Sequence, residues 1–289
     1  MKPNSYRRQA FSLLELVVII AIVAILLAIS IPVVRDMRSI ARRSNCDQNL
    51  TRLLLACQTY AVDHRHLPSG TFSGSAEVWT GVISPDSAQM AELSISSLPE
   101  GYHHNWVSSL LPYLDRKALY DTINFDVGVY APANEGVRET DLPFLRCPAS
   151  VGEQIATTTS YAGLHASESV PIGIDDDGLL MLNHWIVPDE ISDGISYTLL
   201  LGEKLSPREY DLGWMSGTRS SLRNAGTAIN AAVSPEVYHD PAFVGGLGSL
   251  HPGGASAGMA DGSIKFLQDS IDMNVYRAMV NRNDGKQAE

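Results

Sequence analysis

The sequence predicts an α+β protein in which one long N-terminal helix packs on a mostly antiparallel, β-rich domain. The helix is indicated by an uncharged apolar run from Leu16 to Val34, followed by an apolar stripe at three- and four-residue steps. Residues 66–289 contain short apolar runs separated by Gly, Pro, Asn and Asp, which favours strands and loops. We therefore expect the helix over 11–65 and a globular β-rich domain over 66–289. The stripe consists of Ile40, Cys46, Leu50, Leu53, Leu54, Cys57, Tyr60 and Ala61.

The charge of the chain divides at the same place. The 289 residues carry a formal net charge of −11. Residues 1–65 hold nine Lys and Arg against four Asp and Glu, whereas residues 66–289 hold twelve against twenty-eight. An acidic domain argues against nucleic acid as a partner. No H-E-x-x-H, G-x-S-x-G or phosphate-binding glycine loop occurs, so we do not expect an enzyme.

The uncharged run is long enough for a membrane helix. At about 1.5 Å per residue it extends roughly 28 Å, close to the hydrocarbon thickness of about 30 Å. Lys2, Arg7 and Arg8 precede it, which places the N-terminus in the cytoplasm and the remainder outside the inner membrane. The basic residues from Arg35 to Arg43 weaken this assignment of orientation. We expect a single-pass transmembrane segment over 13–34 and an amphipathic helix after it.

One charged residue, Glu15, lies where the apolar helix begins. A carboxylate at mid-bilayer costs about 2.5–3.5 kcal/mol, and less near the surface. Glu15 therefore either reaches back to the headgroups or pairs with a cation outside its own chain. The residues around it resemble the class III leader of type IV prepilins and pseudopilins. The matching segment is Arg7-Arg8-Gln9-Ala10 followed by Phe11-Ser12-Leu13-Leu14-Glu15-Leu16.

This resemblance implies a pilin-like fold and processing by a prepilin peptidase/N-methyltransferase. The enzyme would cleave between Ala10 and Phe11, remove the cytoplasmic leader 1–10 and methylate the new amino group. Ala10 stands where the family usually has Gly, so we expect slower processing. Glu15 would pair with the Phe11 amino group of a neighbouring subunit. Pro32 removes one hydrogen bond of the helix, at a depth where pilins commonly carry a proline.

Near the C-terminus, Asp261-Gly262 between two short apolar runs predicts a β-hairpin. A type I′ turn needs positive φ at both central positions, which Asp-Gly supplies. With this turn, Met259 would pair with Ile264.

His251, Asp261 and Gly262 form an H-x9-DG motif. The motif resembles that of DUF1559, a large prepilin-like family of unknown function that is abundant in planctomycete-type bacteria. His251 and Asp261 could be two metal ligands or a base and its orienting carboxylate, but we favour a structural pair that supports the hairpin. Segments that match the same family, in order, are Cys46–Leu50, Trp106–Leu114, Phe144–Pro148, Ser160–Gly163, Ile191–Glu203 and His251–Ala255.

The acidic run Asp175, Asp176 and Asp177 has two interpretations. Its oxygen ligands could hold calcium, as some pseudopilins do in their C-terminal loops. It lacks the alternating spacing of an EF-hand, however, so a solvated acidic turn is the interpretation we favour.

The three cysteines are partly assignable. Cys46 and Cys57 are about 16 Å apart along a helix, too far for a disulfide, which needs Cα atoms within about 7 Å. Cys147 could reach either of them. Cys46 and Cys147 fall at positions where the resembled family shows cysteine, which implies a Cys46–Cys147 disulfide and a buried Cys57 thiol.

The leading hypothesis is a prepilin- or pseudopilin-like structural subunit, processed by the peptidase and anchored or assembled through its N-terminal helix. Its expected partners are that peptidase, other pilin-like subunits and the inner membrane. The alternative is a membrane-tethered extracytoplasmic module that binds a glycan, a cation or a protein and forms no filament.

Overall fold

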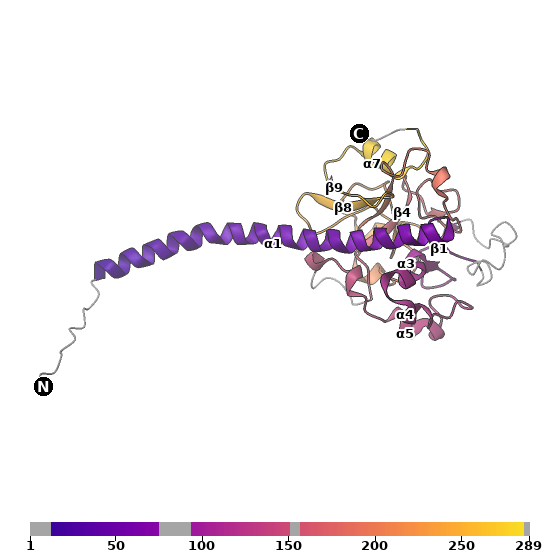
Figure 1. The fold of residues 1–289 in the computed structure, drawn as a ribbon, viewed down its shortest axis with the longest axis horizontal. Coiled ribbons are helices and arrows are strands. Elements are labelled where there is room, and N and C mark those ends of the chain that lie inside the picture. The colour runs from indigo at the N-terminus through magenta and orange to yellow at the C-terminus, as the bar shows by residue number, and fades with distance from the viewer. Residues whose placement is uncertain (1–12, 75–93, 151–156, 286–289) are drawn as a thin grey trace, which may run out of the picture. The chain divides into compact units, whose positions relative to one another are not determined.

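The computed structural model describes residues 13–74, 94–150 and 157–285, and describes residues 29–36 only as backbone. The chain divides into two compact units, 1–42 and 43–289, and each is considered by itself. Among its described residues, the first unit consists of the beginning of one long helix. All strands that the structure describes belong to the second unit (Figure 1).

Helix α1 spans Leu13–His64 and continues through Pro32 without interruption. It ends where Arg65 adopts a left-handed φ of 68° and donates its N–H to the carbonyl of Ala61, a common helix C-terminus. Residues 11 and 12 of the expected helix lie outside the described residues, and the observed end comes one residue before the expected one.

The beginning of α1 exposes its apolar side chains. Leu13 is 82% exposed and Leu27 is 57% exposed. In the part of the chain that the structure describes, no helix has the combination of length and apolar character needed to cross a membrane. The transmembrane segment expected over 13–34 is therefore not identified, and the side chains at its end, from residue 29 onward, lie outside the described set.

Within the 43–289 unit, α1 buries one stripe of side chains and exposes the opposite face. Leu50, Leu53 and Cys57 are 0% exposed, whereas Leu55 is 61% exposed. Ile40, which the sequence placed on the stripe, belongs to the other unit and is 69% exposed. The amphipathic pattern is thus present, but the buried stripe begins later than expected.

The largest sheet has five strands in the order β7-β4-β6-β8-β9. They are β4 (Tyr161–Ala166), β6 (Leu199–Glu203), β7 (Leu222–Asn224), β8 (Gly254–Met259) and β9 (Ile264–Gln268). Strands β4 and β7 run parallel, and the other neighbouring pairs run antiparallel. The expected α+β class with a mostly antiparallel sheet is confirmed.

Helices lie on both faces of β8. A Cβ atom added to Gly258 would lie 2.4 Å from the Leu54 side chain, so this face of the strand packs closely against α1. The alternate residue Ala257 belongs to a buried cluster with Tyr276 of helix α7 (Met273–Val280). Because successive side chains of a strand point to opposite faces, α1 and α7 cover opposite faces of the sheet.

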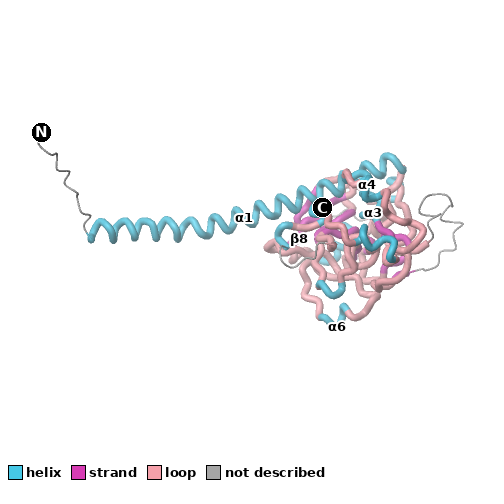
Figure 2. The backbone as a smooth tube through the Cα atoms, turned by 90° about the horizontal axis from the view of Figure 1, so that it is seen from below, coloured by secondary structure: helices cyan, strands magenta, loops and turns pink. Residues whose placement is uncertain are grey.

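The remaining regular elements are short, and Figure 2 shows that loops make up much of the 43–289 unit. Strand β1 pairs with β3, and β2 pairs with β5, in separate two-stranded sheets. Their bounds, with those of the short helices, are β1 (Thr71–Phe72), β2 (Ser94–Ile95), β3 (His104–Asn105), β5 (Ile172–Gly173), α3 (Trp106–Leu110), η2 (Leu111–Leu114), α4 (Lys117–Tyr120), η3 (Pro132–Asn134), α5 (Glu135–Arg138), η4 (Pro143–Leu145), η5 (Pro148–Ser150), η6 (Pro188–Glu190), η7 (Arg208–Tyr210) and α6 (Pro235–Tyr238).

The β8–β9 hairpin forms where it was expected, but its register differs by one residue. Gly258, not Met259, pairs with Ile264. The N–H of Gly262 bonds to the Met259 carbonyl at 3.0 Å, and Gly262 alone in the turn has a positive φ, of 88°. The Asp261 carboxylate accepts the N–H two residues further on, at 2.9 Å. These features define a type I turn followed by a left-handed glycine, which adds one residue to the loop that the type I′ prediction assumed.

Two adjacent histidines are buried beside β3. His103 Nδ1 lies 3.3 Å from the Tyr130 hydroxyl, and His104 Nε2 lies 2.9 Å from the Val127 carbonyl. Burial lowers the pKa of each imidazole to about 4. Both side chains are therefore neutral in the folded protein at neutral pH.

Replacing Leu54 with Ala tests the packing of α1 on the sheet. We expect the free energy of unfolding to fall by about 2–5 kcal/mol, the usual cost of removing a buried leucine side chain. Leu55→Ala is the matched control, because Leu54 is 1% exposed and Leu55 is 61% exposed. The control should change stability by less than about 0.5 kcal/mol. Chemical denaturation followed by tryptophan fluorescence measures both, and equal losses would contradict the packing described.

Stability should also fall in mild acid. The two folded-state pKa values of about 4 lie below the value of about 6.5 for an exposed histidine, so the unfolded chain binds protons first as the pH falls. The contribution is fully present above pH 6.5 and is lost between pH 6.5 and pH 4. Thermal unfolding across this range should show a declining midpoint, with a shallower decline for His104→Gln. A His104→Gln profile as steep as that of the parent chain would refute this account.

Candidate functional site

A disulfide joins α1 to the loop that precedes η5. Cys46 and Cys147 are bonded, with their Cα atoms 5.0 Å apart. The Tyr161 hydroxyl donates to the Cys46 carbonyl at 3.0 Å, and the Cys147 N–H donates to the Ser160 hydroxyl at 2.7 Å. Tyr161 begins β4 and Ser160 directly precedes it, so the chain at the start of this strand contacts both cysteines. The pairing is the one that the family resemblance implies, and Cys57 is a buried free thiol.

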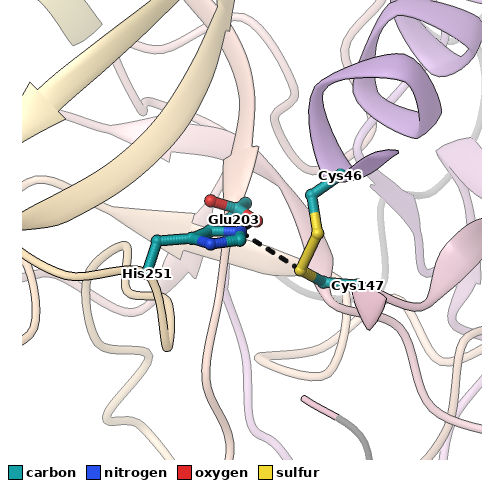
Figure 3. A group of neighbouring side chains, drawn as sticks. All are labelled: Cys46, Cys147, Glu203 and His251. Atoms are coloured by element: carbon teal, nitrogen blue, oxygen red, sulfur yellow. Dashed lines mark hydrogen bonds and ion pairs between the residues drawn. A yellow bond between two sulfur atoms is a disulfide. The ribbon is translucent and has the colours of Figure 1, made fainter. Parts of the chain in front are cut away.

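His251 and Glu203 lie directly beside this disulfide (Figure 3). His251 Nε2 is 3.3 Å from Cys147 Sγ and 3.2 Å from Glu203 Oε1. Glu203 is the last residue of β6, and its Oε2 accepts the Ser256 N–H from β8 at 2.8 Å. Its Oε1 accepts no well-formed hydrogen bond although it is buried. The side chains of His251 and Glu203 are each 2% exposed, so this pair is closed to bulk water.

The loop before β8 positions His251. Its N–H donates to the Ser249 hydroxyl at 3.0 Å, and that hydroxyl donates to the Gly254 carbonyl at 2.6 Å. Gly253 has a φ of 83°, a conformation that side chains rarely adopt, and it turns the chain into the strand. A Cβ atom at Gly254 would lie 2.0 Å from the Leu267 carbonyl, so this position also requires glycine.

His251 and Asp261 do not meet. They lie beyond opposite ends of β8, and Asp261 instead caps the hairpin turn. Our interpretation of them as a pair that supports the hairpin is therefore wrong, because the strand that separates them is extended by about 3.3 Å per residue. Asp261 and Gly262 remain structural, whereas His251 faces the disulfide.

The length of the H-x9-DG motif matches the length of the α1 segment between Cys46 and Gln58. At one end of β8, His251 lies beside Cys46 of α1. At the other end, the turn residue Gly262 lies near Gln58 of α1, because a Cβ atom added to Gly262 would be 2.7 Å from Gln58 Nε2. Twelve residues of helix extend about 18 Å, and six residues of strand extend about 20 Å. The two ends of the H-x9-DG motif thus lie at the two ends of the same helix–strand contact.

The acidic run is distributed over several partners. Asp176 Oδ2 lies 2.6 Å from His165 Nδ1, while Asp177 accepts hydrogen bonds from Ser167 and from the Asn281 side chain. Asp175 is exposed. Asp176 and Asp177 are therefore directed to separate protein groups, and calcium binding by the run stays a prediction.

The expected assembly residues are described only in part. Ala10 and Phe11 lie outside the described residues. Glu15 is exposed in the first turn of α1, and the side chain of Pro32 lies outside the described set.

Sequence reasoning missed a second polar group, next to Glu203. Lys204 Nζ lies 2.7 Å from Asp211 Oδ2 and 2.9 Å from the Ser206 hydroxyl, which also binds Arg223. Burial lowers the pKa of Lys204 to about 8, against the opposing effect of the Asp211 carboxylate. Lys204, Ser206 and Asp211 lie close together in the stretch that follows β6, whereas Arg223 belongs to β7, and no motif in the sequence singles them out. The group borders a cavity of about 300 Å³ whose polar lining includes Ser150, Thr158, Thr159, Lys204, Ser206, Asp211 and Tyr238.

Of all the residues described, one group offers three or more ligand atoms to a metal ion. It consists of Cys46, Cys147, Glu203 and His251, whose ligand atoms lie within 4.8 Å of one another. Of these four, the sequence singled out the two cysteines and His251. Glu203 occurs at the end of a matched family segment, but nothing in its spacing predicted that it would face His251.

The N-terminus and the domain together define a prepilin-like protein. Residues 5–31 match the prokaryotic N-terminal methylation motif. Residues 35–274 match the family described as protein of unknown function (DUF1559). This match covers most of the chain, so the protein belongs to the DUF1559 family, and both resemblances inferred from the sequence are confirmed. No curated protein and no solved structure matches the chain.

Thiol counting tests the disulfide. After denaturation without reductant, we expect one reactive thiol per chain, that of Cys57, because Cys46 and Cys147 are bonded. Reduction before denaturation should raise the count to three. Mass spectrometry of the labelled chain identifies the modified residues. Three thiols without reduction would exclude the disulfide.

Proposed function

We propose that this chain is a prepilin- or pseudopilin-like structural subunit. A prepilin peptidase/N-methyltransferase removes residues 1–10 and methylates Phe11, and α1 then anchors the subunit in the inner membrane or assembles it with other pilin-like subunits. The observation that carries the proposal is the methylation motif over 5–31, followed directly by a family domain over 35–274.

The exposed apolar side chains at the beginning of α1 support this role. Leu14 is 74% exposed, Ile20 is 59% exposed and Ile25 is 60% exposed. Contiguous apolar surface of this extent normally marks a contact with lipid or with another protein. Lipid or the corresponding helices of other subunits would cover it.

Glu15 supplies the polar contact in this scheme. It is the one ionisable residue between Leu13 and Val34. Its pairing with the Phe11 amino group of an adjacent subunit would neutralise both charges in an apolar setting, where an unpaired charge is costly. The same pairing would set the axial position of one helix relative to the next.

The disulfide is compatible with a domain outside the inner membrane. Disulfides form and persist in the bacterial periplasm and at cell surfaces, and are rare in the cytosol. We therefore place residues 66–289 on the extracytoplasmic side and the N-terminus in the cytoplasm.

The cavity beside Lys204 favours a second candidate, a membrane-tethered binding module. Hydroxyl groups, a buried ammonium group and the Tyr238 ring line it. This lining suits a polar, hydroxylated ligand such as a glycan better than a cation. In this second function α1 is a tether only.

Glu15→Ala distinguishes the two functions. In a host that processes prepilins, the parent chain should yield a mature protein that begins at methylated Phe11, measured by intact mass and N-terminal peptide mapping. Glu15→Ala should still be cleaved but should reduce recovery of the subunit in cross-linked assemblies by about tenfold or more, because the register contact is lost. Val17→Ala is the control in the same exposed segment and should assemble normally.

Two results would contradict the structural role. One is a chain that retains Met1 in cells that process other prepilins. The other is an undiminished yield of assemblies from Glu15→Ala, which would favour the tethered module.

A further inference from the structure

The two disulfide cysteines and the two side chains beside them, His251 and Glu203, form a group of atoms of the kind that bind metal ions. Two sulfur atoms, one imidazole nitrogen and one carboxylate oxygen lie within 4.8 Å of one another. The four residues come from α1, from the loop before η5, from the end of β6 and from the loop before β8. All four residues are buried, at 0–4% exposure.

The distances between these atoms suit a tetrahedral zinc ion. With Zn–S bonds of about 2.3 Å and Zn–N and Zn–O bonds of about 2.0–2.1 Å, tetrahedral geometry separates S from N by about 3.6 Å and N from O by about 3.3 Å. The observed separations are 3.3 Å from Cys147 Sγ to His251 Nε2 and 3.2 Å from His251 Nε2 to Glu203 Oε1. The two sulfur atoms must move apart to about 3.8 Å, and breaking their bond permits this. All four ligand atoms already lie within 4.8 Å of one another.

We propose that the dithiol form of this protein binds one Zn²⁺ through Cys46, Cys147, His251 and Glu203. An external dithiol supplies two electrons and two protons, which cleave the S–S bond to two thiols while the reductant becomes a disulfide. Zn²⁺ then displaces one proton from each thiol and binds both thiolates. His251 donates the Nε2 lone pair, and Glu203 contributes Oε1. The proposal is independent of the pilin-like role.

The environment of Glu203 supports a metal site independently of the two cysteines. Its Oε1 is buried and accepts no well-formed hydrogen bond, while Oε2 is held by the Ser256 N–H. A buried carboxylate oxygen without a hydrogen bond reduces the stability of the fold unless an ion or a hydrogen-bond donor satisfies it. The carboxylate is therefore already oriented, with the unsatisfied oxygen directed toward the histidine and the sulfur atoms.

The donor set selects zinc over calcium or magnesium. Thiolate and imidazole are ligands of zinc, whereas calcium takes six to eight oxygen ligands and magnesium requires octahedral oxygen coordination. Four protein ligands in a closed site are typical of a structural zinc rather than a catalytic one, which keeps a position open for water. The zinc form would link α1 to the loop before η5, as the disulfide does, and also to the end of β6 and to the loop before β8.

Cobalt and zinc binding to the full-length chain in detergent tests the proposal. The chain is prepared oxidised, and also reduced by a non-thiol phosphine that is then removed, and each form is titrated with Co²⁺ or Zn²⁺ alone. We expect one metal ion per reduced chain by elemental analysis after desalting, and none per oxidised chain. The Co²⁺ form should show thiolate-to-cobalt charge transfer and the intense visible absorption of tetrahedral cobalt.

Three variants identify the ligands. Glu203→Gln and His251→Ala should each weaken Co²⁺ binding by at least about tenfold, the lower end of the cost of losing even a ligand's hydrogen-bonded partner. Glu203→Gln preserves the shape of its side chain and should keep the charge-transfer band while changing the visible bands. Cys57→Ala is the matched control, because Cys57 is a buried cysteine outside the cluster, and it should bind as the parent chain does.

Three results would overturn the proposal. The first is a reduced, folded parent chain that binds no zinc. The second is affinity and spectra unchanged in both Glu203→Gln and His251→Ala. The third is a chain that loses its circular dichroism on reduction and does not regain it with zinc.

Discussion

Helix α1 packs directly against the backbone of strand β8 at Gly258. Gly258 has no side chain where Leu54 packs, and the four two-residue strands form two small sheets apart from the main one. A short sheet surrounded by loops needs a second layer for stability. Leu50 and Leu53 belong to the same buried cluster as Leu200 of β6, so α1 supplies that layer.

This contact also explains the positions of the H-x9-DG residues. The histidine brings the beginning of β8 to the disulfide on α1, and the Asp-Gly turn brings its end near Gln58. The covalent bond, the buried His251–Glu203 pair and the turn glycine are thus three parts of one attachment. The proposed zinc site would preserve that attachment when the covalent bond is reduced.

Local patterns in the sequence predicted most of the fold. The three- and four-residue periodicity located the buried face of α1 from Cys46 onward, and the Asp-Gly pair located the hairpin, because both depend on short-range backbone geometry. The hairpin register was missed because a type I turn with a left-handed Gly262 and a type I′ turn accept the same two residues. Ile40 was assigned to the buried face because periodicity does not reveal where the partner surface ends.

The candidate site was predictable only in part. Family resemblance paired Cys46 with Cys147, whereas Glu203 came to the site through strand pairing between β6 and β8, which spacing along the chain does not reveal. The neighbouring Lys204 meets Ser206 and Asp211 within one stretch after β6, but the approach of Arg223 from β7 depends on the tertiary fold. The acidic run from Asp175 to Asp177 resembled a ligand set in sequence, but tertiary contacts with His165 and Asn281 disperse its carboxylates.

The place of the disulfide along α1 has a mechanical consequence. Cys46 lies at the N-terminal end of the part of α1 that belongs to the 43–289 unit. Tension that enters this unit through the helix therefore meets a covalent bond before it meets the apolar contacts of Leu50, Leu53 and Leu54. The force passes at that point into the loop before η5, so the remaining turns of α1 are shielded from it while the bond is intact. Reduction of the disulfide would instead transmit the same tension to the apolar contacts that α1 makes with the sheet.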